Sequence, residues 1–282
     1  MLKNLLVFLY KIKFFKRIIP SLLRKFNFIY LNHIFHIENF KIKLDLKNSL
    51  ERKIFLEGSF EPEQTSFLKD NIKNIKFNYF IDIGSYIGYY TLFFSSFSNI
   101  DKIISIEANS INYNYLLDNI SLNNLNNVYT YNLGCSNRDE NAKLWFSNTN
   151  KMGGSSILEE QDFEYKKYNL NPFLNNDHLK KHYNKSIKDY KKTNSDFIYH
   201  NIKTKKLDNL LKVKNKTLLI KIDVERHEHS VLVGSENILN NNKIFLQIEI
   251  FPELFKKINL FLEEKNFKLI KNIGWDYYYK NF

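Results

Sequence analysis

The chain has 282 residues, a net charge of +12 and a single cysteine, Cys135. One cysteine excludes an internal disulfide framework and a cysteine-based zinc site, so the sequence is typical of a reducing compartment and predicts a cytoplasmic location. Hydrophobic residues make up 44% of the chain and aromatic residues 16%, which indicates a globular protein. The length fits one α/β domain with extensions.

The positive charge indicates attraction to anions without distinguishing nucleic acid, an anionic membrane or a phosphorylated substrate. Residues 1–30 contain seven basic residues and no acidic one. Their apolar run at 5–10 is too short to span a bilayer. We expect a basic amphipathic helix that packs on the domain or on a partner subunit. The alternative is a peripheral contact with the inner face of a membrane.

The main domain is expected to begin near residue 61. Residues 30–46 partly alternate between apolar and polar, which predicts a β-hairpin ahead of the main sheet. A loop follows, and Pro62 is well placed at the start of a helix that leads into the first strand. The sequence therefore predicts an N-terminal extension over residues 1–60 and a main domain over residues 61–282.

A buried strand that ends in Asp82 is followed by a turn containing Gly84 and Gly88, and then by a helix. A parallel sheet binds its ligand at the carboxyl end of such a strand, where Gly84 permits a tight turn and the close approach of a ligand. Glu107 ends the next strand and is positioned to accept hydrogen bonds from ribose hydroxyls. The glycine spacing differs from Gly-x-Gly-x-x-Gly, so it favours S-adenosylmethionine over NAD.

The rest of the chain alternates strands and helices and predicts an α/β fold with a seven-stranded, mostly parallel sheet covered by helices on both faces. The expected strands cover residues 79–83, 102–107, 128–133, 217–223, 243–250 and a final pair over 267–280, the last of them antiparallel.

The segment at about residues 158–202 interrupts this alternation. It is rich in lysine and carries interleaved tyrosines, so we expect an insertion that covers the substrate site and attracts an anionic substrate. A solvated basic surface is the alternative. The donor-rich loop before it, which contains Ser155, is either a linker or part of the wall around the cofactor or substrate.

Acidic residues follow two neighbouring strands. Asp223 ends the fourth predicted strand and Glu249 the fifth, and His227 follows one turn after Asp223. The carboxyl ends of adjacent strands face one crevice, where a hydroxyl nucleophile gains from a general base. His227 is the best base by intrinsic pKa and Asp223 the best by position. Asp223 and Glu249 could instead bind Mg²⁺, so the metal requirement stays open.

With these motifs in place, the chain resembles FkbM-type S-adenosylmethionine-dependent methyltransferases from about residue 58 to residue 250. The resemblance is carried by Glu61-Pro62, Asp82-x-Gly84-x-x-x-Gly88-x-x-Thr91, Glu107-x-Asn109, Gly153-Gly154-Ser155-Ser156, and Lys221-Ile222-Asp223-Val224-Glu225 with Glu228, Gly234 and Glu249. It implies a Rossmann-like class I methyltransferase fold and O-methylation of a small molecule or sugar.

The motifs and the resemblance together predict the site. The expected cofactor-binding residues are Glu61, Asp82, Gly84, Tyr86, Gly88, Thr91, Glu107, Asn109, Ser136 and Asp223. The catalytic candidates are Asp223, His227 and Glu249. Ser155 and Arg226 are the expected substrate-binding residues. Arg226 replaces a glycine that is common in the family, and it is expected to bind an anionic substrate or to narrow the site.

The sequence thus predicts an S-adenosylmethionine-dependent O-methyltransferase acting on a sugar hydroxyl, in a nucleotide-activated sugar or a surface-glycan residue of a capsule or lipopolysaccharide. The alternatives are a non-sugar metabolite as acceptor, or a nucleic-acid-binding protein or RNA methyltransferase. The sequence contains no recognised nucleic-acid module, so we expect no nucleic-acid partner. The other expected partners are a membrane surface, contacted through residues 1–30, and further copies of the chain.

Overall fold

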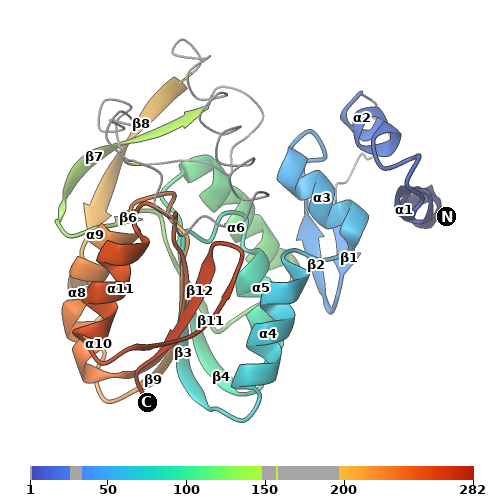
Figure 1. Ribbon diagram of the computed structural model, residues 1–282. Coiled ribbons are helices and arrows are strands. Elements are labelled where there is room, and N and C mark those ends of the chain that lie inside the picture. The colour runs from blue at the N-terminus through green and yellow to red at the C-terminus, as the bar shows by residue number, and fades with distance from the viewer. Residues whose placement is uncertain (1, 26–33, 148–156, 158–196) are drawn as a thin grey trace.

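A computed structural model describes residues 2–25, 34–147, 157 and 197–282 of the chain (Figure 1). Most of the predicted insertion and Ser155 lie outside the described residues. None of the described helices combines the length and the apolar composition that a membrane-spanning segment needs.

The centre of the molecule is the predicted seven-stranded sheet, in the order β11-β12-β10-β9-β3-β4-β5. Its strands are β3 (Phe77–Ile83), β4 (Ile100–Ile106), β5 (Val128–Tyr131), β9 (Thr217–Ile222), β10 (Lys243–Glu249), β11 (Lys268–Ile273) and β12 (Asp276–Lys280). Neighbours from β5 to β10 pair in parallel, and β12 runs antiparallel to both β10 and β11. This arrangement confirms the predicted seven-stranded, mostly parallel sheet, including its antiparallel last strand.

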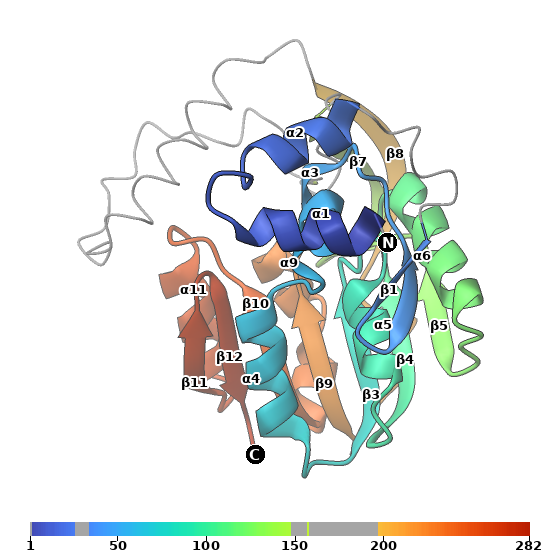
Figure 2. The same ribbon diagram turned by 90° about the vertical axis from the view of Figure 1, so that its right-hand side faces the viewer.

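Helices cover both faces of the sheet (Figures 1 and 2). One face carries α4 (Pro62–Ile72), α5 (Tyr89–Ser95) and α6 (Ser110–Leu122), and the other carries α8 (Leu207–Leu210), α9 (Glu228–Val233), α10 (Glu236–Asn241) and α11 (Phe255–Glu263). Successive residues of a strand point to opposite faces, so Phe80 belongs to one hydrophobic core and Ile81 to the other. Burial on both faces explains the near-continuous apolar runs of the central strands.

Two helix boundaries bear on the site. The chain after Asp223 forms two helices, α9 and α10, separated at Gly234 and Ser235. A Cβ at Gly234 would lie 1.9 Å from the backbone oxygen of Ser136, so only glycine fits where the chain passes this close. At the start of α6, Asn109 is the N-cap, since its side chain accepts a hydrogen bond from the backbone N–H of Ile111.

The N-terminal extension contains α1 (Leu2–Lys11), α2 (Ile18–Lys25), the predicted hairpin β1 (Ile34–Ile37) and β2 (Phe40–Lys43), and α3 (Ser49–Glu57). The single basic helix expected there is therefore two helices. The sequence reading missed α3, which is capped by Asn48 at its start and by left-handed Gly58 at its end. The extension shares the core of the α4–α5 face, where the Phe40 ring lies 5.4 Å from that of Tyr89.

A second, three-stranded sheet stands beside the main one, in the order β6-β8-β7. It consists of β6 (Gly134–Cys135), β7 (Glu140–Ser147) and β8 (Phe197–Lys205). Strand β8 begins at Phe197, within the last residues of the predicted insertion, and pairs with β7 along its length.

Candidate functional site

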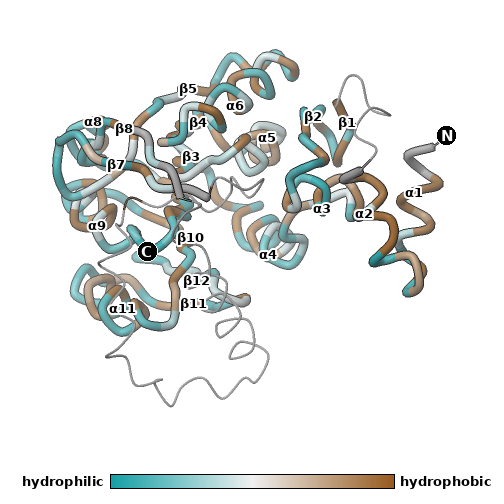
Figure 3. Tube along the Cα trace, turned by 90° about the horizontal axis from the view of Figure 1, so that it is seen from above, coloured by the Kyte–Doolittle hydropathy of each residue, from teal (hydrophilic) through white to brown (hydrophobic). Residues whose placement is uncertain are grey.

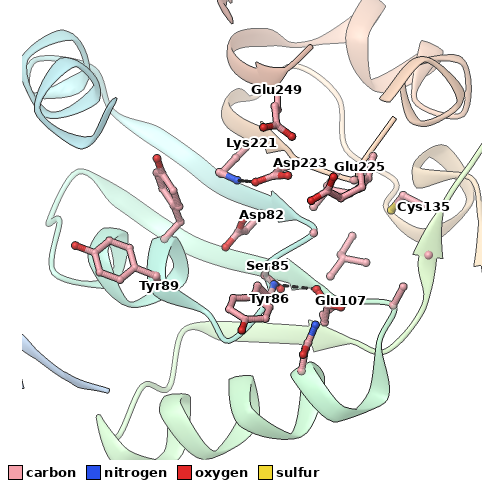
Figure 4. Close-up of a pocket in the computed structure, with 18 of the residues that line it drawn as sticks. Asp82, Ser85, Tyr86, Tyr89, Glu107, Cys135, Lys221, Asp223, Glu225 and Glu249 are labelled. Atoms are coloured by element: carbon pink, nitrogen blue, oxygen red, sulfur yellow. Dashed lines mark hydrogen bonds and ion pairs between the residues drawn. The ribbon is translucent and has the colours of Figure 1, made fainter. Parts of the chain in front are cut away.

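A cavity of about 220 Å³ lies at the carboxyl ends of the central strands, in the position that the sequence predicts (Figure 4). Its charged lining residues are Glu61, Asp82, Glu107, Lys221, Asp223, Glu225 and Glu249. Six carboxyl groups and one ammonium group therefore face the same space. The electrostatic character of this wall is acidic, although the whole chain is strongly basic.

The turn after β3 is shaped by two left-handed glycines. Gly84 has φ +81°, and a Cβ there would lie 1.8 Å from the backbone oxygen of Asp223. The close approach expected of a ligand is thus made by the end of β9, which places Asp82 and Asp223 at adjacent strand ends. Gly88 has φ +89°, and a Cβ there would meet Leu116 of α6 at 2.5 Å. Gly88 therefore allows α5 to pack against α6 and does not line the cavity.

Asp82 is fully buried beneath this turn, and its Oδ2 accepts a 2.8 Å hydrogen bond from Thr91. The Thr91 hydroxyl also lies 2.7 Å from the Ser105 hydroxyl, so Thr91 supports Asp82 from below and does not line the cavity. Asp82 Oδ1 and Ser85 Oγ have no hydrogen-bond partner among the described residues. Burial raises the pKa of Asp82 to about 6. Both unpartnered atoms belong to residues of the cavity wall.

Glu107 at the end of β4 is held in a fixed orientation. Its Oε2 accepts a hydrogen bond from the backbone N–H of Tyr86, and its Oε1 accepts one from that of Asn109, both at 2.8 Å. Burial raises its pKa to about 7. A carboxylate oxygen has two lone pairs, so these bonds leave room for ligand hydroxyls. Asn109 positions Glu107 and does not itself line the cavity.

Lys221 is the one described cation of the cavity wall, and the sequence reading did not assign it to the site. Its Nζ lies 2.7 Å from Asp223 Oδ2 and 4.8 Å from the centroid of the Tyr90 ring. Burial alone would lower the pKa of Lys221. The negative charges of neighbouring carboxylates, first Asp223 and then Glu61, outweigh burial and raise this pKa above its usual value. A lysine inside an otherwise apolar, buried strand was the signal that could have identified it.

The remaining acids stand around this ion pair (Figure 4). Burial, followed by the charges of neighbouring carboxylates, raises the pKa of Glu225 to about 8 and that of Glu249 well above its usual value. Glu61 begins α4 with a left-handed φ of 48° and accepts a 2.7 Å hydrogen bond from the Tyr90 hydroxyl. Burial raises its pKa to about 7. Glu61 and Glu249 thus line the cavity as expected, and Glu225 joins them.

His227 and Ser136 lie behind the cavity rather than on it. His227 Nε2 is 3.0 Å from the Ser136 hydroxyl, and neither residue is part of the lining. Burial lowers the pKa of His227 to about 4, so its imidazole is neutral at physiological pH. The expectation that His227 faces the reacting groups therefore finds no support in the described lining of the cavity. Gly134 and Cys135 of β6, directly before Ser136, do line the cavity.

Arg226 is also absent from the described lining. Its Nε lies 3.0 Å from Glu253 Oε1, and its guanidinium stacks 3.8 Å from the centroid of the Phe251 ring. Glu228 accepts hydrogen bonds from the backbone N–H groups of Arg226 and Val224, which closes the turn after β9. The expected contact of Arg226 with an anionic substrate therefore finds no support, because its guanidinium is paired with Glu253 and stacked on Phe251, both in the loop after β10.

Apolar and aromatic residues complete the wall, among them Phe60, Tyr89, Tyr90 and, from the unexpected helix α3, Leu50 and Ile54. Within the described part of the chain, no three acidic, histidine or cysteine side chains are grouped to hold a metal ion.

Comparisons with known proteins were made by family, sequence and structure. A family model described as the methyltransferase FkbM domain matches residues 82–269. A comparison with curated proteins finds no match. The chain is similar to the crystal structure of methyltransferase FkbM from Methylobacillus flagellatus KT, at 15% identity and a TM-score of 0.44, covering 82% of this chain and 52% of that one. The chain thus spans about half the length of that protein.

A second similar structure is that of M. jannaschii TYW2 in complex with AdoMet, at 14% identity and a TM-score of 0.42, covering 88% of this chain and 82% of that one. A third is a putative RNA methyltransferase, PH1948 from Pyrococcus horikoshii, at 8% identity and a TM-score of 0.37, covering 77% and 82%.

Proposed function

Because the chain belongs to the FkbM methyltransferase family, we propose that it transfers the methyl group of S-adenosylmethionine to a sugar hydroxyl. The acceptor is a nucleotide-activated sugar or a surface-glycan residue, as in a capsule or lipopolysaccharide. The family supports the methyl transfer itself. The observation that carries the rest is the acidic cavity at the carboxyl ends of β3, β4, β9 and β10.

The residues of this cavity fit the cofactor. When bound, S-adenosylmethionine supplies a methyl group activated by a sulfonium cation. The carboxylates around Lys221 favour such a cation and would repel the pyrophosphate of NAD. Glu107 offers lone pairs to ribose hydroxyls, and the unpartnered oxygens of Asp82 and Ser85 can bond to the polar groups of the amino-acid part.

Glu249 is the proposed general base. It lies on the cavity wall, and its raised pKa makes its carboxylate a stronger proton acceptor than an ordinary glutamate. It would take the proton of the acceptor hydroxyl as that oxygen receives the methyl group that bound S-adenosylmethionine would supply, with S-adenosylhomocysteine as the leaving group. Asp223, which is held by Lys221 at 2.7 Å, would orient the acceptor for this transfer.

The aromatic part of the wall supports a sugar as the acceptor. The Phe60 ring lies 5.5 Å from the Tyr89 ring and 6.2 Å from the Tyr90 ring, all beside the acidic residues. The apolar face of a sugar ring packs well on such rings, while carboxylates accept hydrogen bonds from its hydroxyls. A phosphate group on the acceptor would need cations from outside this wall, and the lysine-rich segment expected to supply them lies outside the described residues.

The test measures formation of S-adenosylhomocysteine by the purified chain with a panel of glycan sugars, nucleotide sugars, hydroxylated non-sugar metabolites and RNA. Turnover with a sugar and loss of that turnover in Glu249→Gln, by about 10²-fold or more, support the proposal. Calorimetric titration should show that this variant still binds S-adenosylmethionine.

His227→Gln is the matched control. Because His227 lies behind the cavity wall, this variant should keep the turnover of the unmodified chain. A reversed pattern, with Glu249→Gln active and His227→Gln inactive, would overturn the assignment of the base. Turnover only with non-sugar metabolites or RNA would overturn the acceptor class.

A further inference from the structure

Helices α1 and α2 are apolar on two sides. On the inner side, Ile19 and Leu23 are buried, and Leu6 and Leu9 pack against the same core. The outer side carries six exposed apolar residues, here called the outer apolar patch: Leu5, Phe8, Ile12, Phe14, Ile18 and Leu22. Phe8 is 63% exposed and Phe14 is 72% exposed. A helix that is apolar all round normally has both sides covered.

The members of the outer apolar patch follow one another along the two helices and the turn between them. Leu5 and Phe8 are three residues apart and share one face of α1, and Ile12 comes directly after the last residue of α1. Ile18 and Leu22 are spaced by four and share one face of α2, and Phe14 lies in the turn that joins the helices. Figure 2 shows α1 and α2 side by side, and Figure 3 shows their predominantly hydrophobic course at one end of the molecule.

Exposed cations lie at the turn within this patch, and the sequence places no acid near them. Lys11, Lys13, Lys16 and Arg17 are exposed in and beside the turn between α1 and α2. Residues 1–37 contain no aspartate or glutamate. A symmetric dimer through this patch would bring identical surfaces together, so these cations would face cations. A surface with negative charge above an apolar layer satisfies both features, and an anionic lipid bilayer is such a surface.

We propose that the α1–α2 pair docks the protein on anionic lipid bilayers, with the outer apolar patch at the boundary of headgroups and acyl chains and the cations on lipid phosphates. Helix α1 packs against α3, whose Leu50 and Ile54 line the cavity. The membrane contact therefore lies one helix away from the candidate active site, on the side toward which the strands of the main sheet end (Figure 2). The proposal is independent of which acceptor is methylated.

The test is flotation of the full chain with vesicles of phosphatidylcholine alone and with about 30% phosphatidylglycerol. We expect flotation with the anionic vesicles only, and its weakening by about 0.5 M NaCl, which screens the lysines. The double substitution Phe8→Ser with Phe14→Ser should lower the vesicle partition coefficient by about tenfold or more. Lys13→Glu with Lys16→Glu should act in the same direction.

Two controls separate docking from damage. Leu260→Ser removes an apolar side chain of α11 that is 50% exposed on another part of the molecule, and it should leave flotation unchanged. The melting temperature of the Phe8 and Phe14 double variant should equal that of the unmodified chain, because both rings are exposed. Absence of flotation with any vesicle would overturn the proposal, and so would flotation that survives the double substitution. A dimer in sedimentation that this substitution dissociates, without vesicle binding, would assign the patch to a second copy.

Discussion

The ammonium group of Lys221 lies 2.7 Å from the carboxylate of Asp223, with the Tyr90 ring on another side at 4.8 Å. Only 5% of the Lys221 side chain is exposed, and the charges of Glu61 and Asp82 also act on it. This single cation offsets repulsion among the acids of the cavity wall. The carboxyl groups of the wall can therefore lie close together and still bind a cationic ligand.

Replacing Lys221 by methionine should leave these acids without their counter-ion. We expect the free energy of unfolding, measured by urea denaturation, to fall by about 3 kcal/mol, since breaking a buried ion pair strands its partner. The control is Lys43→Met, which breaks a 2.6 Å pair with Asp118 whose side chains are 40% and 55% exposed. That loss should be at most about 1 kcal/mol. Equal losses in the two variants would contradict a special role for Lys221.

Stability should fall as the pH rises from about 6 to about 8. Burial raises the pKa of Glu51, Glu107 and Glu228 to about 7 and that of Glu225 to about 8. In the unfolded chain these groups ionise near pH 4.3. In the window between, the folded chain holds more protons than the unfolded chain, so each rise in pH favours unfolding.

This pH dependence is checked by melting temperatures in buffers of constant ionic strength. The melting temperature should be lower at pH 8 than at pH 6, and the difference should shrink in Glu107→Gln, which has one such proton fewer to lose. A melting temperature that rises over this window would show that the acids of the wall are ionised in the folded chain already at pH 6.

Much of the site follows from topology that the sequence makes visible. Asp82, Glu107, Asp223 and Glu249 each stand at or next to the end of a predicted parallel strand, and all four line the cavity. Parallel strands that end at one sheet edge bring such residues together whatever the loops do. The same rule does not predict where a side chain points when its residue lies in a loop.

His227 and Arg226 show this limit. Both follow the strand end that carries Asp223, but Glu225 and Arg226 have left-handed φ values of 52° and 77°. These rare conformations redirect the turn, so that His227 points to Ser136 and Arg226 to Glu253. No spacing pattern in the sequence predicts that a residue other than glycine has a left-handed backbone conformation. Residue type therefore suggested a base and an anion site that the backbone geometry does not support.

Gly84→Ala should be far more damaging than an alanine at another left-handed glycine. A Cβ at Gly84 would lie 1.8 Å from the backbone oxygen of Asp223, which cannot move without distorting β9. The matched control is Gly274→Ala, where φ is +62° and nothing lies within 4 Å of the added atom. The control should lose about 1 kcal/mol of unfolding free energy from backbone strain alone. Gly84→Ala should lose more than about 4 kcal/mol of unfolding free energy or fail to fold. Similar losses of stability in the two variants, measured by thermal denaturation, would contradict the close approach of Gly84 to Asp223.

Tyr86→Phe should loosen the link between the N-terminal extension and the glycine turn. The Tyr86 hydroxyl donates a 2.6 Å hydrogen bond to Glu51 of α3 and accepts one from Asn48, while its backbone N–H holds Glu107. Removing the hydroxyl leaves the buried Glu51 carboxyl short of a donor, so we expect a loss of about 1–3 kcal/mol in urea denaturation.

The affinity for S-adenosylmethionine, measured by calorimetric titration, should fall severalfold in the same variant because Tyr86 also positions Glu107. The control is Tyr113→Phe, whose part-buried hydroxyl lies 2.9 Å from the Thr130 hydroxyl and joins α6 to β5, and neither residue lines the cavity. That variant should lose about 1 kcal/mol of stability and no affinity. Unchanged affinity in Tyr86→Phe, together with the expected loss of stability, would mean that α3 supports the fold without setting the geometry of the glycine turn.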